Sequence, residues 1–175
     1  MPEGEAVKVK MQPLDSEAFK PYGQVLESKM PIFPDVDKGE GRVAMELVKV
    51  KQPRTNRVDE IYIHYSYNQS FIPLEGSFVL IVAPAPPKEV GKGEGDYKLD
   101  YDKLAAFVIE PGQAAIIEKG VWHAACSIGP ECTLINVTRK DPGEKTSDQF
   151  GHPTDRGYIG AVEFSKRGRA IELEF

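Results

Sequence analysis

Two stretches of this chain carry a similar pattern of polar residues and glycines. Residues 62–76 read YIHYSYNQSFIPLEG, and residues 112–127 read GQAAIIEKGVWHAACS. Each stretch places a histidine in a strand-like run. The tyrosine that opens the first stretch is two residues from His64, so strand alternation directs both side chains to one face. If the inner faces of the two stretches meet, His64, Gln69 and His123 converge. The pattern therefore predicts a small β-barrel with polar side chains inside it.

Glycines mark the turns of both stretches. Gly76 closes the turn that ends the first stretch, where glycine readily adopts the positive φ angle that other residues avoid. Gly112 opens the second stretch, and Gly120 makes its sharp turn. The segment between the two stretches, residues 83–102, is rich in glycine, proline and charged residues. We expect it to be a solvated loop.

The rest of the chain consists largely of short runs rich in β-branched and aromatic residues, each bounded by Gly, Pro or Asp. One short helix is expected after Asp15, whose side chain suits an N-cap, and it must end before Pro21. No other segment keeps a period of 3.6 residues, so the pattern indicates an all-β sandwich, jelly roll or barrel. Strands are predicted at residues 8–12, 24–27, 43–50, 60–65, 69–72, 77–82, 106–109, 114–117, 123–127, 133–138, 158–164 and 170–175.

Bulk composition limits the class of protein. A length of 175 residues suits a single domain over residues 1–175, which buries roughly 70% of its unfolded surface. A net charge of -5 and an isoelectric point near 5.3 disfavour a nucleic-acid partner. No apolar run approaches the roughly 20 residues of a membrane span, and the charged N-terminus lacks a signal-peptide core. We therefore expect a cytoplasmic protein with no membrane partner.

The two cysteines are too few for a secreted disulfide scaffold. Cys126 lies an odd number of residues after His123, so we expect it to face away from that histidine. Cys126 and Cys132 flank the sequence Ile-Gly-Pro at residues 128–130, which is typical of a hairpin turn. We expect two ordinary thiols, with a disulfide across the hairpin as the alternative.

The two stretches resemble the two motifs of the cupin superfamily. In the usual first motif a His-x-His pair is followed by Glu and then by Gly; here Tyr62 stands in for the first His and Gln69 for the Glu. The Gly and His positions of the second motif are matched by Gly112, Gly120 and His123. The resemblance implies an all-β, single-domain cupin barrel of the jelly-roll type with a short N-terminal helix. An immunoglobulin-like sandwich is the alternative fold, but it leaves the spaced motifs unexplained.

Three further segments narrow the resemblance to one family. They are residues 13–25 (PLDSEAFKPYGQV), 68–73 (NQSFIP) and 120–123 (GVWH), followed by Arg139 at the end of the next predicted strand. Together they are similar to ureidoglycolate lyases, once called ureidoglycolate hydrolases. The resemblance implies a cupin, usually dimeric, that splits ureidoglycolate into glyoxylate and urea in purine and allantoin nitrogen catabolism.

The resemblance and the residue chemistry together define a candidate site. His123, His64 and Lys119 are the candidate catalytic residues, because imidazoles exchange protons near neutral pH and a lysine offers a positive charge. Arg139 can bind a substrate carboxylate through two parallel hydrogen bonds. The remaining predicted substrate-binding residues are Gln69, Tyr62 and Trp122.

Two imidazoles and an amide oxygen can also bind a divalent metal. His64, Gln69 and His123 are the candidate ligands, and Ni, Mn, Fe or Zn are the candidate ions. A bound metal would hold the substrate oxygens and lower the pKa of the substrate hydroxyl. Each of these candidates has a purely structural alternative. The histidines, Gln69, Tyr62 and Trp122 could be buried hydrogen-bonding or packing residues. Lys119 could lie in a solvated turn, and Arg139 could form an ion pair.

Two other functions remain open beside the lyase. One is a metal-dependent cupin that acts as an isomerase or dioxygenase on another small acid or sugar. The other is a non-catalytic cupin that binds a small ligand. Where the lyase family carries Glu-Arg before the first-motif histidine, this chain has Tyr62 and Ile63, which favours the last alternative. The expected partners are a small-molecule carboxylate substrate and a second subunit of a homodimer, with residues 170–175 as a candidate strand for the subunit contact.

Overall fold

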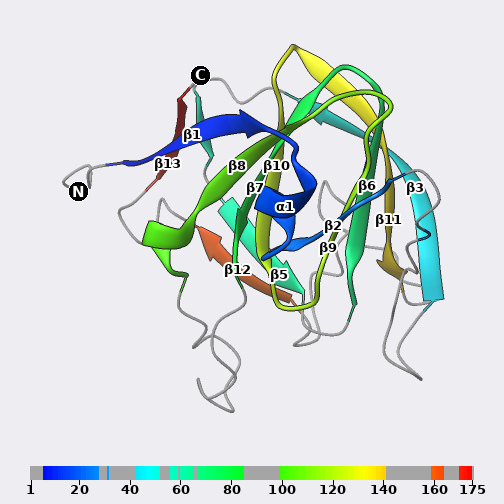
Figure 1. Ribbon diagram of the computed structural model, residues 1–175, viewed down its shortest axis with the longest axis horizontal. Helices are drawn as coiled ribbons and strands as arrows, with labels where there is room; N and C mark the ends of the chain where they lie inside the picture. Colours follow the sequence, from blue (N-terminus) through cyan, green and yellow to red (C-terminus); the bar gives the residue numbers. More distant parts are fainter. Residues whose placement is uncertain are drawn as a thin grey trace.

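The computed structural model describes residues 6–27, 31, 42–51, 56–58, 60–64, 67–84, 99–140, 159–163 and 170–174 (Figure 1). In these residues two β-sheets face each other, accompanied by two short helical turns. The expectation of an all-β barrel with a short N-terminal helix is confirmed. Most of the loop predicted at residues 83–102 lies outside the described residues.

The larger sheet has eight described strands. Its neighbours pair antiparallel, except that β1 runs parallel to both β8 and β13. Their spatial order is β12 (Ile159–Glu163), β5 (Glu60–His64), β10 (Trp122–Ser127), β7 (Phe78–Ala83), β8 (Ala105–Ile109), β1 (Val7–Pro13), β13 (Ile171–Glu174) and β4 (Arg57–Val58).

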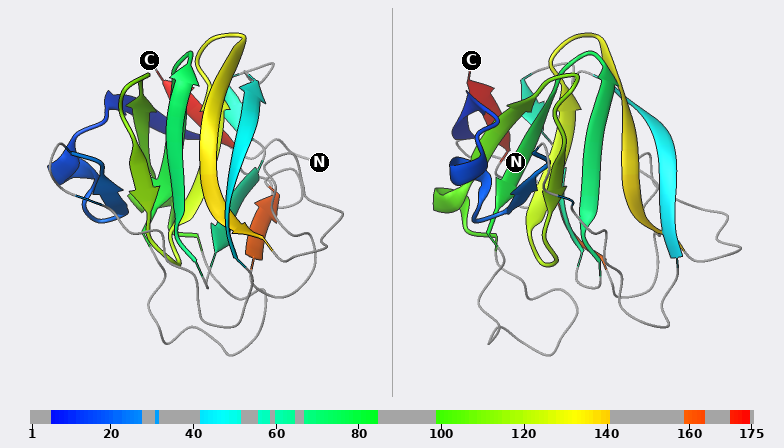
Figure 2. Two further views of the ribbon diagram at one scale, coloured as in Figure 1. Left: turned by 90° about the vertical axis from the view of Figure 1, so that its right-hand side faces the viewer. Right: turned by 45° about the vertical axis from the view of Figure 1, so that its right-hand side comes forward.

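The smaller sheet has five described strands, and all its neighbours pair antiparallel. Its two longest strands form a ribbon at one edge, which Figure 2 shows in cyan and yellow. Their register is regular over ten residue pairs, so side chains alternate strictly between the two faces of this ribbon. The spatial order is β2 (Gly23–Val25), β9 (Ala115–Ile117), β6 (Gln69–Glu75), β11 (Glu131–Lys140) and β3 (Arg42–Lys51).

An apolar core fills the space between the two sheets. In it, Phe71 of the smaller sheet packs in one cluster with Phe78 and Leu80 of the larger sheet. The opposite face of the larger sheet is buried in a second cluster, which includes Ile63 and Trp122. We call this second cluster the outer core. The larger sheet is therefore apolar on both faces. A polar side chain that points between the sheets is unusual here and is a candidate for a functional role.

Helix α1 (Ser16–Phe19) begins at the predicted N-cap. Asp15 Oδ1 accepts a hydrogen bond of 2.9 Å from the Ala18 amide. Phe19 is buried at the helix end, where its ring packs edge-on against Phe107 with centroids 5.2 Å apart. A second turn, η1 (Tyr101–Lys103), precedes β8. No helix among the described residues is long and apolar enough to cross a membrane.

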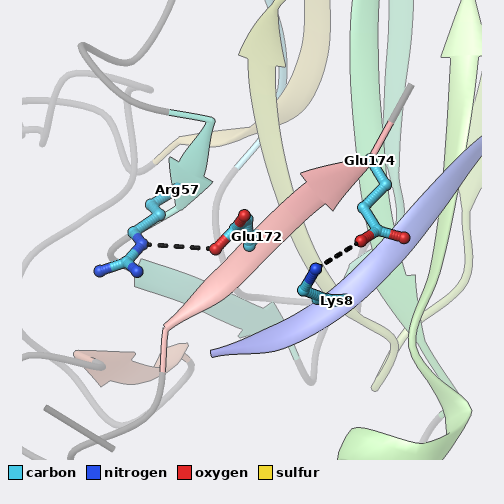
Figure 3. Close-up of polar contacts among 4 residues, drawn as sticks. All are labelled: Lys8, Arg57, Glu172 and Glu174. Carbon is cyan, nitrogen blue, oxygen red and sulfur yellow. Dashed lines mark hydrogen bonds and ion pairs between the residues drawn. The ribbon is translucent and has the colours of Figure 1, made fainter. Parts of the chain in front are cut away.

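The last described strand, β13, lies between two others. It pairs with β1 on one side and with β4 on the other. Ion pairs accompany both contacts (Figure 3): Lys8 Nζ lies 2.9 Å from Glu174 Oε1, and Arg57 Nε lies 3.6 Å from Glu172 Oε2. These side chains are largely exposed, so the strand pairing contributes more than the charges do. The strand predicted at residues 170–175 thus pairs within its own chain.

The two cysteines face different parts of the core. Cys126 lies in the outer core, away from His123 as predicted. Cys132 lies in the core between the sheets, and its thiol donates to the Gly76 carbonyl at 3.4 Å. Both are free thiols, so the alternative of a disulfide across the hairpin is wrong. Burial raises the pKa of Cys126 to about 12 and also raises the pKa of Cys132.

We expect neither thiol to react with an aromatic disulfide reagent in the native protein at pH 8. The thiolate is the reactive form, and a pKa raised by burial keeps each thiol protonated at that pH. After unfolding in urea the pKa values return to roughly 8.5, and two thiols per chain should then be titrated. Rapid reaction of a thiol in the native protein, or fewer than two after unfolding, would contradict this placement of the cysteines.

Candidate active site

The two predicted motifs lie side by side in the larger sheet. β5 and β10 pair antiparallel, and their register sets His123 opposite Tyr62. The turn before β10 is held against the end of β5, because the Gly120 amide donates to the His64 carbonyl at 2.6 Å. Gly120 has a φ of 81°, which is the left-handed conformation that favours glycine. The predicted glycine turn therefore joins the two motifs directly.

Strand alternation directs the histidines into the barrel. On β5, Ile63 belongs to the outer core, so its neighbours Tyr62 and His64 point between the sheets. On β10, Trp122 belongs to the outer core, while His123 lines a pocket between the sheets. The structure thus brings the two histidines together, with ring centroids 4.7 Å apart.

His123 has a defined tautomer. Its Nδ1 lies 3.0 Å from the carbonyl oxygen of Val121. A carbonyl oxygen can only accept a hydrogen bond, so Nδ1 carries the proton. In the neutral ring the lone pair is then on Nε2, which is buried. His123 can therefore accept a proton only through Nε2.

His64 contacts a second buried ring. The Tyr67 hydroxyl lies 2.8 Å from His64 Nδ1, and the two rings stack with centroids 4.5 Å apart at an interplanar angle of 24°. Both side chains are buried. A hydrogen bond between two buried polar groups fixes the ring orientation of the histidine.

Gln69 and Asn136 form a pair of amides on the facing sheet. Gln69 Nε2, on β6, donates to Asn136 Oδ1, on β11, at 2.8 Å. The Gln69 side chain is 1% exposed, and its Oε1 has no hydrogen-bond partner among the described residues. A buried oxygen in this state costs free energy unless a ligand or a water supplies a donor. Gln69 thus offers a hydrogen-bond acceptor to whatever enters the barrel.

A pocket of about 360 Å³, part of it open to solvent, lies between these groups. His123 and Tyr62 line it from the larger sheet, and Gln69 and Asn136 line it from the smaller sheet. His64 is not one of the lining side chains and meets the pocket through its contact with the His123 ring. The remaining walls are apolar: Val48, Val50, Phe71, Ala124, Ala125 and Leu134. A few polar groups set in otherwise apolar walls are typical of a small-molecule site.

Besides His64, three predicted site residues do not line this pocket. Trp122, predicted as a substrate-binding residue, faces the outer core on the opposite side of β10 from His123, so the structure does not bring it to the pocket. Arg139 is buried, but it is three residues from Asn136 on a regular strand and so lies on the other face of β11. Lys119 is half-buried in the turn before β10.

Two residues of the site were not identified from the sequence. Asn136 has a detectable signal, since it is an amide at an inward position of a strand whose neighbouring inward residue is Leu134. Tyr67 has none, because its contact with His64 depends on how the chain returns from β5 to β6 rather than on strand alternation.

The donor set does not match a strong divalent-metal site. The converging donors are two imidazoles and one amide, and the described residues contain no group of three or more His, Cys, Asp or Glu side chains that could hold a metal ion. Such a set lacks the anionic ligand that divalent ions in proteins usually have. These donors suit acid–base chemistry better than metal binding, and metal binding by His64, Gln69 and His123 stays a prediction.

The N-terminal segment holds the second motif in place. The Glu118 amide donates to the Tyr22 carbonyl at 2.9 Å, and Gln24 Nε2 donates to Glu118 Oε1 at 3.1 Å. The backbones approach closely here, because a Cβ atom at Gly23 would lie 1.9 Å from the Ile116 carbonyl oxygen. The Tyr-Gly pair of the N-terminal segment therefore fixes β9, the strand that leads into the second motif.

Comparison with known proteins assigns the chain to a family. A family model described as ureidoglycolate lyase matches residues 34–153, more than half of the chain. The chain belongs to the ureidoglycolate lyase family. The resemblance predicted from the motifs is confirmed, and the family match includes both histidines of the site and Arg139.

Two curated ureidoglycolate lyases illustrate the relationship within the family. The protein of Burkholderia mallei (strain NCTC 10229) is 32% identical over 160 residues, which cover 79% of this chain and 86% of that protein. The protein of Escherichia coli O9:H4 (strain HS) is 31% identical over 134 residues, which cover 67% and 78%. A crystal structure of a dTDP sugar isomerase from Desulfovibrio desulfuricans G20 gives a TM-score of 0.44 at 15% identity, over 79% of this chain and 72% of that one.

Proposed function

We propose that this chain is a ureidoglycolate lyase, a carbon–nitrogen lyase that splits ureidoglycolate into glyoxylate and urea in purine and allantoin nitrogen catabolism. Membership of the family supports the substrate. One structural observation carries the site: His123 and Gln69, from facing sheets, line the same pocket as a proton acceptor and a hydrogen-bond acceptor.

The reaction requires only proton transfer and correct positioning. The central carbon of ureidoglycolate carries a hydroxyl, a carboxylate and the ureido nitrogen. Cleavage removes the hydroxyl proton, forms the carbonyl of glyoxylate and breaks the carbon–nitrogen bond, while the leaving nitrogen gains a proton to become urea. The number of protons is unchanged overall. The imidazole of His123 lines the pocket, with the His64 ring beside it, and an imidazole suits the proton exchange that this reaction needs near neutral pH.

The amide pair supports recognition of the ureido group. A ureido group presents several N–H donors, and Gln69 Oε1 is a buried acceptor oriented by the bond to Asn136. On the opposite wall, the Tyr62 hydroxyl donates to the Glu60 carboxylate. Tyr62 stands where the family carries a glutamate. In this chain the Glu60 carboxylate is hydrogen-bonded to Tyr62, the residue that replaces the family's glutamate.

The substrate carboxylate needs a positively charged partner. Arg139 and Lys119 are the proposed partners, because guanidinium and ammonium groups both bind carboxylates. Neither side chain is part of the described pocket lining, and Arg139 lies on the other face of β11 from Asn136, so the proposed role comes from the family resemblance and not from the pocket geometry.

The products of the reaction test the proposal. Purified protein incubated with ureidoglycolate should release glyoxylate and urea in equal amounts, faster than the spontaneous decay and without ammonia. Treatment with a chelator should leave the rate unchanged, since the site groups are acid–base groups. Ammonia in place of urea would instead indicate hydrolysis of the ureido amide and would contradict a lyase.

The other outcomes of this experiment identify the alternatives. A rate lost on chelation and restored by Ni²⁺, Mn²⁺, Fe²⁺ or Zn²⁺ would support metal binding by His64, Gln69 and His123 and would contradict the metal-free chemistry. Thermal stabilisation by ureidoglycolate with no product would indicate a non-catalytic binding protein. Neither product nor stabilisation would direct the search to another small acid.

We further propose that the protein is a homodimer formed through the outer face of the smaller sheet. Met45 is 71% exposed and Leu47 is 69% exposed on β3, and Val43 and Leu74 are also exposed. No described element covers these four side chains, and Figure 2 (left) shows β6, β11 and β3 side by side toward the viewer. Soluble monomers rarely expose a contiguous apolar patch of more than a few hundred Å².

A second copy of the chain suits this face. Two copies of one twisted sheet present the same curvature, so they can pack face to face across a two-fold axis about 10 Å apart. A shallow groove of about 420 Å³ beside Leu26, Ile72 and Val137 lies on the same face. It gives protruding side chains of a second copy a place to pack.

We expect Met45→Glu to shift the protein from dimer to monomer in light scattering coupled to size-exclusion chromatography. The substitution places a charge at the centre of an apolar contact, where desolvation is unfavourable. Lys10→Glu is the matched control, because it changes a charge on β1 of the larger sheet and should leave the dimer intact. A wild-type protein that is monomeric at micromolar concentration would contradict the proposed interface.

We also propose a cytoplasmic location. The two cysteines are buried free thiols, as is usual in reducing compartments.

A further inference from the structure

The two histidines of the site differ in what their Nδ1 atoms contact. His123 Nδ1 lies 3.0 Å from a carbonyl oxygen, that of Val121. His64 Nδ1 lies 2.8 Å from a hydroxyl, that of Tyr67. A carbonyl can only accept a hydrogen bond, whereas a hydroxyl can donate one. The proton of each neutral ring is therefore placed by a different partner.

We infer that Tyr67 is a positioning residue that donates to His64 Nδ1 and so places the His64 proton on Nε2, which leaves His123 as the proton acceptor of the pair. This inference rests on the proposed function for its effect on turnover, but its structural part does not.

The direction of the bond between Tyr67 and His64 follows from the acidity of the two groups. A phenol is a far stronger acid than a neutral imidazole N–H, and an imidazole nitrogen is a stronger acceptor than a phenol oxygen. The arrangement O–H···N is therefore favoured over N–H···O. The 2.8 Å separation and the burial of both side chains strengthen this preference, because water does not compete for either group.

The consequence is an asymmetric pair. His123 Nε2 has the lone pair, and His64 Nε2 has the hydrogen, while the two rings lie 4.7 Å apart. In the cleavage step, His123 Nε2 takes the proton from the substrate hydroxyl and returns it to the leaving nitrogen as the carbon–nitrogen bond breaks. The two substrate atoms are bonded to one carbon, so a single imidazole can serve both. His64 remains a neutral N–H donor beside this base, and Tyr67 keeps it so.

Nitrogen NMR of the histidine side chains tests the structural part directly. The chain has three histidines, so the signals of His64 and His123 can be assigned with the variants His64→Asn and His123→Asn. We expect the wild type at neutral pH to show His123 protonated on Nδ1 and His64 protonated on Nε2. Tyr67→Phe should remove the preference at His64 and leave the tautomer of His123 unchanged. His64 protonated on Nδ1 in the wild type, or unaltered in Tyr67→Phe, would overturn the inference.

Kinetics test the consequence for turnover. Tyr67→Phe should lower kcat for ureidoglycolate about tenfold, as the loss of one hydrogen bond suggests, with KM unchanged. Tyr22→Phe is the matched control, because it removes a hydroxyl from a tyrosine that packs against Phe19 and Phe107 and should alter neither kcat nor the tautomers. An altered His64 tautomer with an unaltered kcat would overturn the positioning role. No turnover by the wild type, with the expected tautomers, would contradict the proposed function alone.

Discussion

Replacing His123 with alanine is expected to lower kcat/KM for ureidoglycolate cleavage by a factor of about 10²–10⁴, the usual contribution of a general base. His123 is the histidine that lines the pocket, and the Val121 carbonyl directs its lone pair to Nε2. Alanine removes that lone pair and leaves the apolar walls of the pocket in place. The measurement is the initial rate of glyoxylate formation at several substrate concentrations.

Ser127→Ala is the matched control for this variant. Ser127 lies on the same strand, at a position that alternates onto the same face as His123, and is buried as well. It is not part of the pocket lining, so we expect its rate to equal that of the wild type. A His123→Ala protein that folds, as judged by its melting temperature, and retains full activity would show that the base is elsewhere.

Replacing Gly23 with alanine is expected to destabilise the protein by about 3 kcal/mol, at the upper end of the usual cost of overpacking. A Cβ atom there would lie 1.9 Å from the Ile116 carbonyl oxygen, which is backbone and cannot rotate away. The pairing of β2 with β9 would have to open. Two hydrogen bonds depend on that pairing: the Glu118 amide donates to the Tyr22 carbonyl, and Gln24 donates to the Glu118 carboxylate. Activity should therefore fall together with stability.

Urea denaturation measures the effect of Gly23→Ala, with Gly129→Ala as its control. A Cβ atom at Gly129 meets nothing within 4 Å, so that variant should stay within about 0.5 kcal/mol of the wild type. Equal unfolding midpoints for the two variants would mean that β2 does not approach β9 as closely as described. Loss of stability with full retention of activity would separate the N-terminal segment from the site.

Local rules predicted the parts of the site that lie on regular strands and tight turns. Alternation along β5 placed His64 on an inward face, and the same rule turned Cys126 away from His123. The positive φ angles at Gly76 and Gly120 follow from the turn chemistry of glycine. These features depend on a few neighbouring residues, so a sequence contains enough information to specify them.

Family resemblance assigned some roles that alternation does not support. Trp122 is next to His123 in the sequence, and a strand sends adjacent side chains to opposite faces. Arg139 lies three positions after Asn136 on β11, so these two side chains also point to opposite faces. In both cases the motif identified the right strand, while the period of two decides which of its residues face the pocket.

Contacts between distant segments could not be predicted from the sequence. The parallel pairing of β1 with β8 and β13 joins segments about a hundred residues or more apart. The bond between Gln69 and Asn136 depends on β6 lying beside β11. Such pairings follow from the packing of the whole sheet rather than from local residue patterns.

We expect ureidoglycolate to be cleaved in the pocket lined by His123, Gln69, Asn136 and Tyr62. A crystal structure of the His123→Ala variant soaked with ureidoglycolate tests this most directly, because the slowed variant should retain its substrate. We predict substrate density in this pocket, with the ureido N–H groups at Gln69 Oε1 and the hydroxyl toward the position of the missing imidazole. Substrate bound elsewhere on the protein, with this pocket unchanged, would contradict the account.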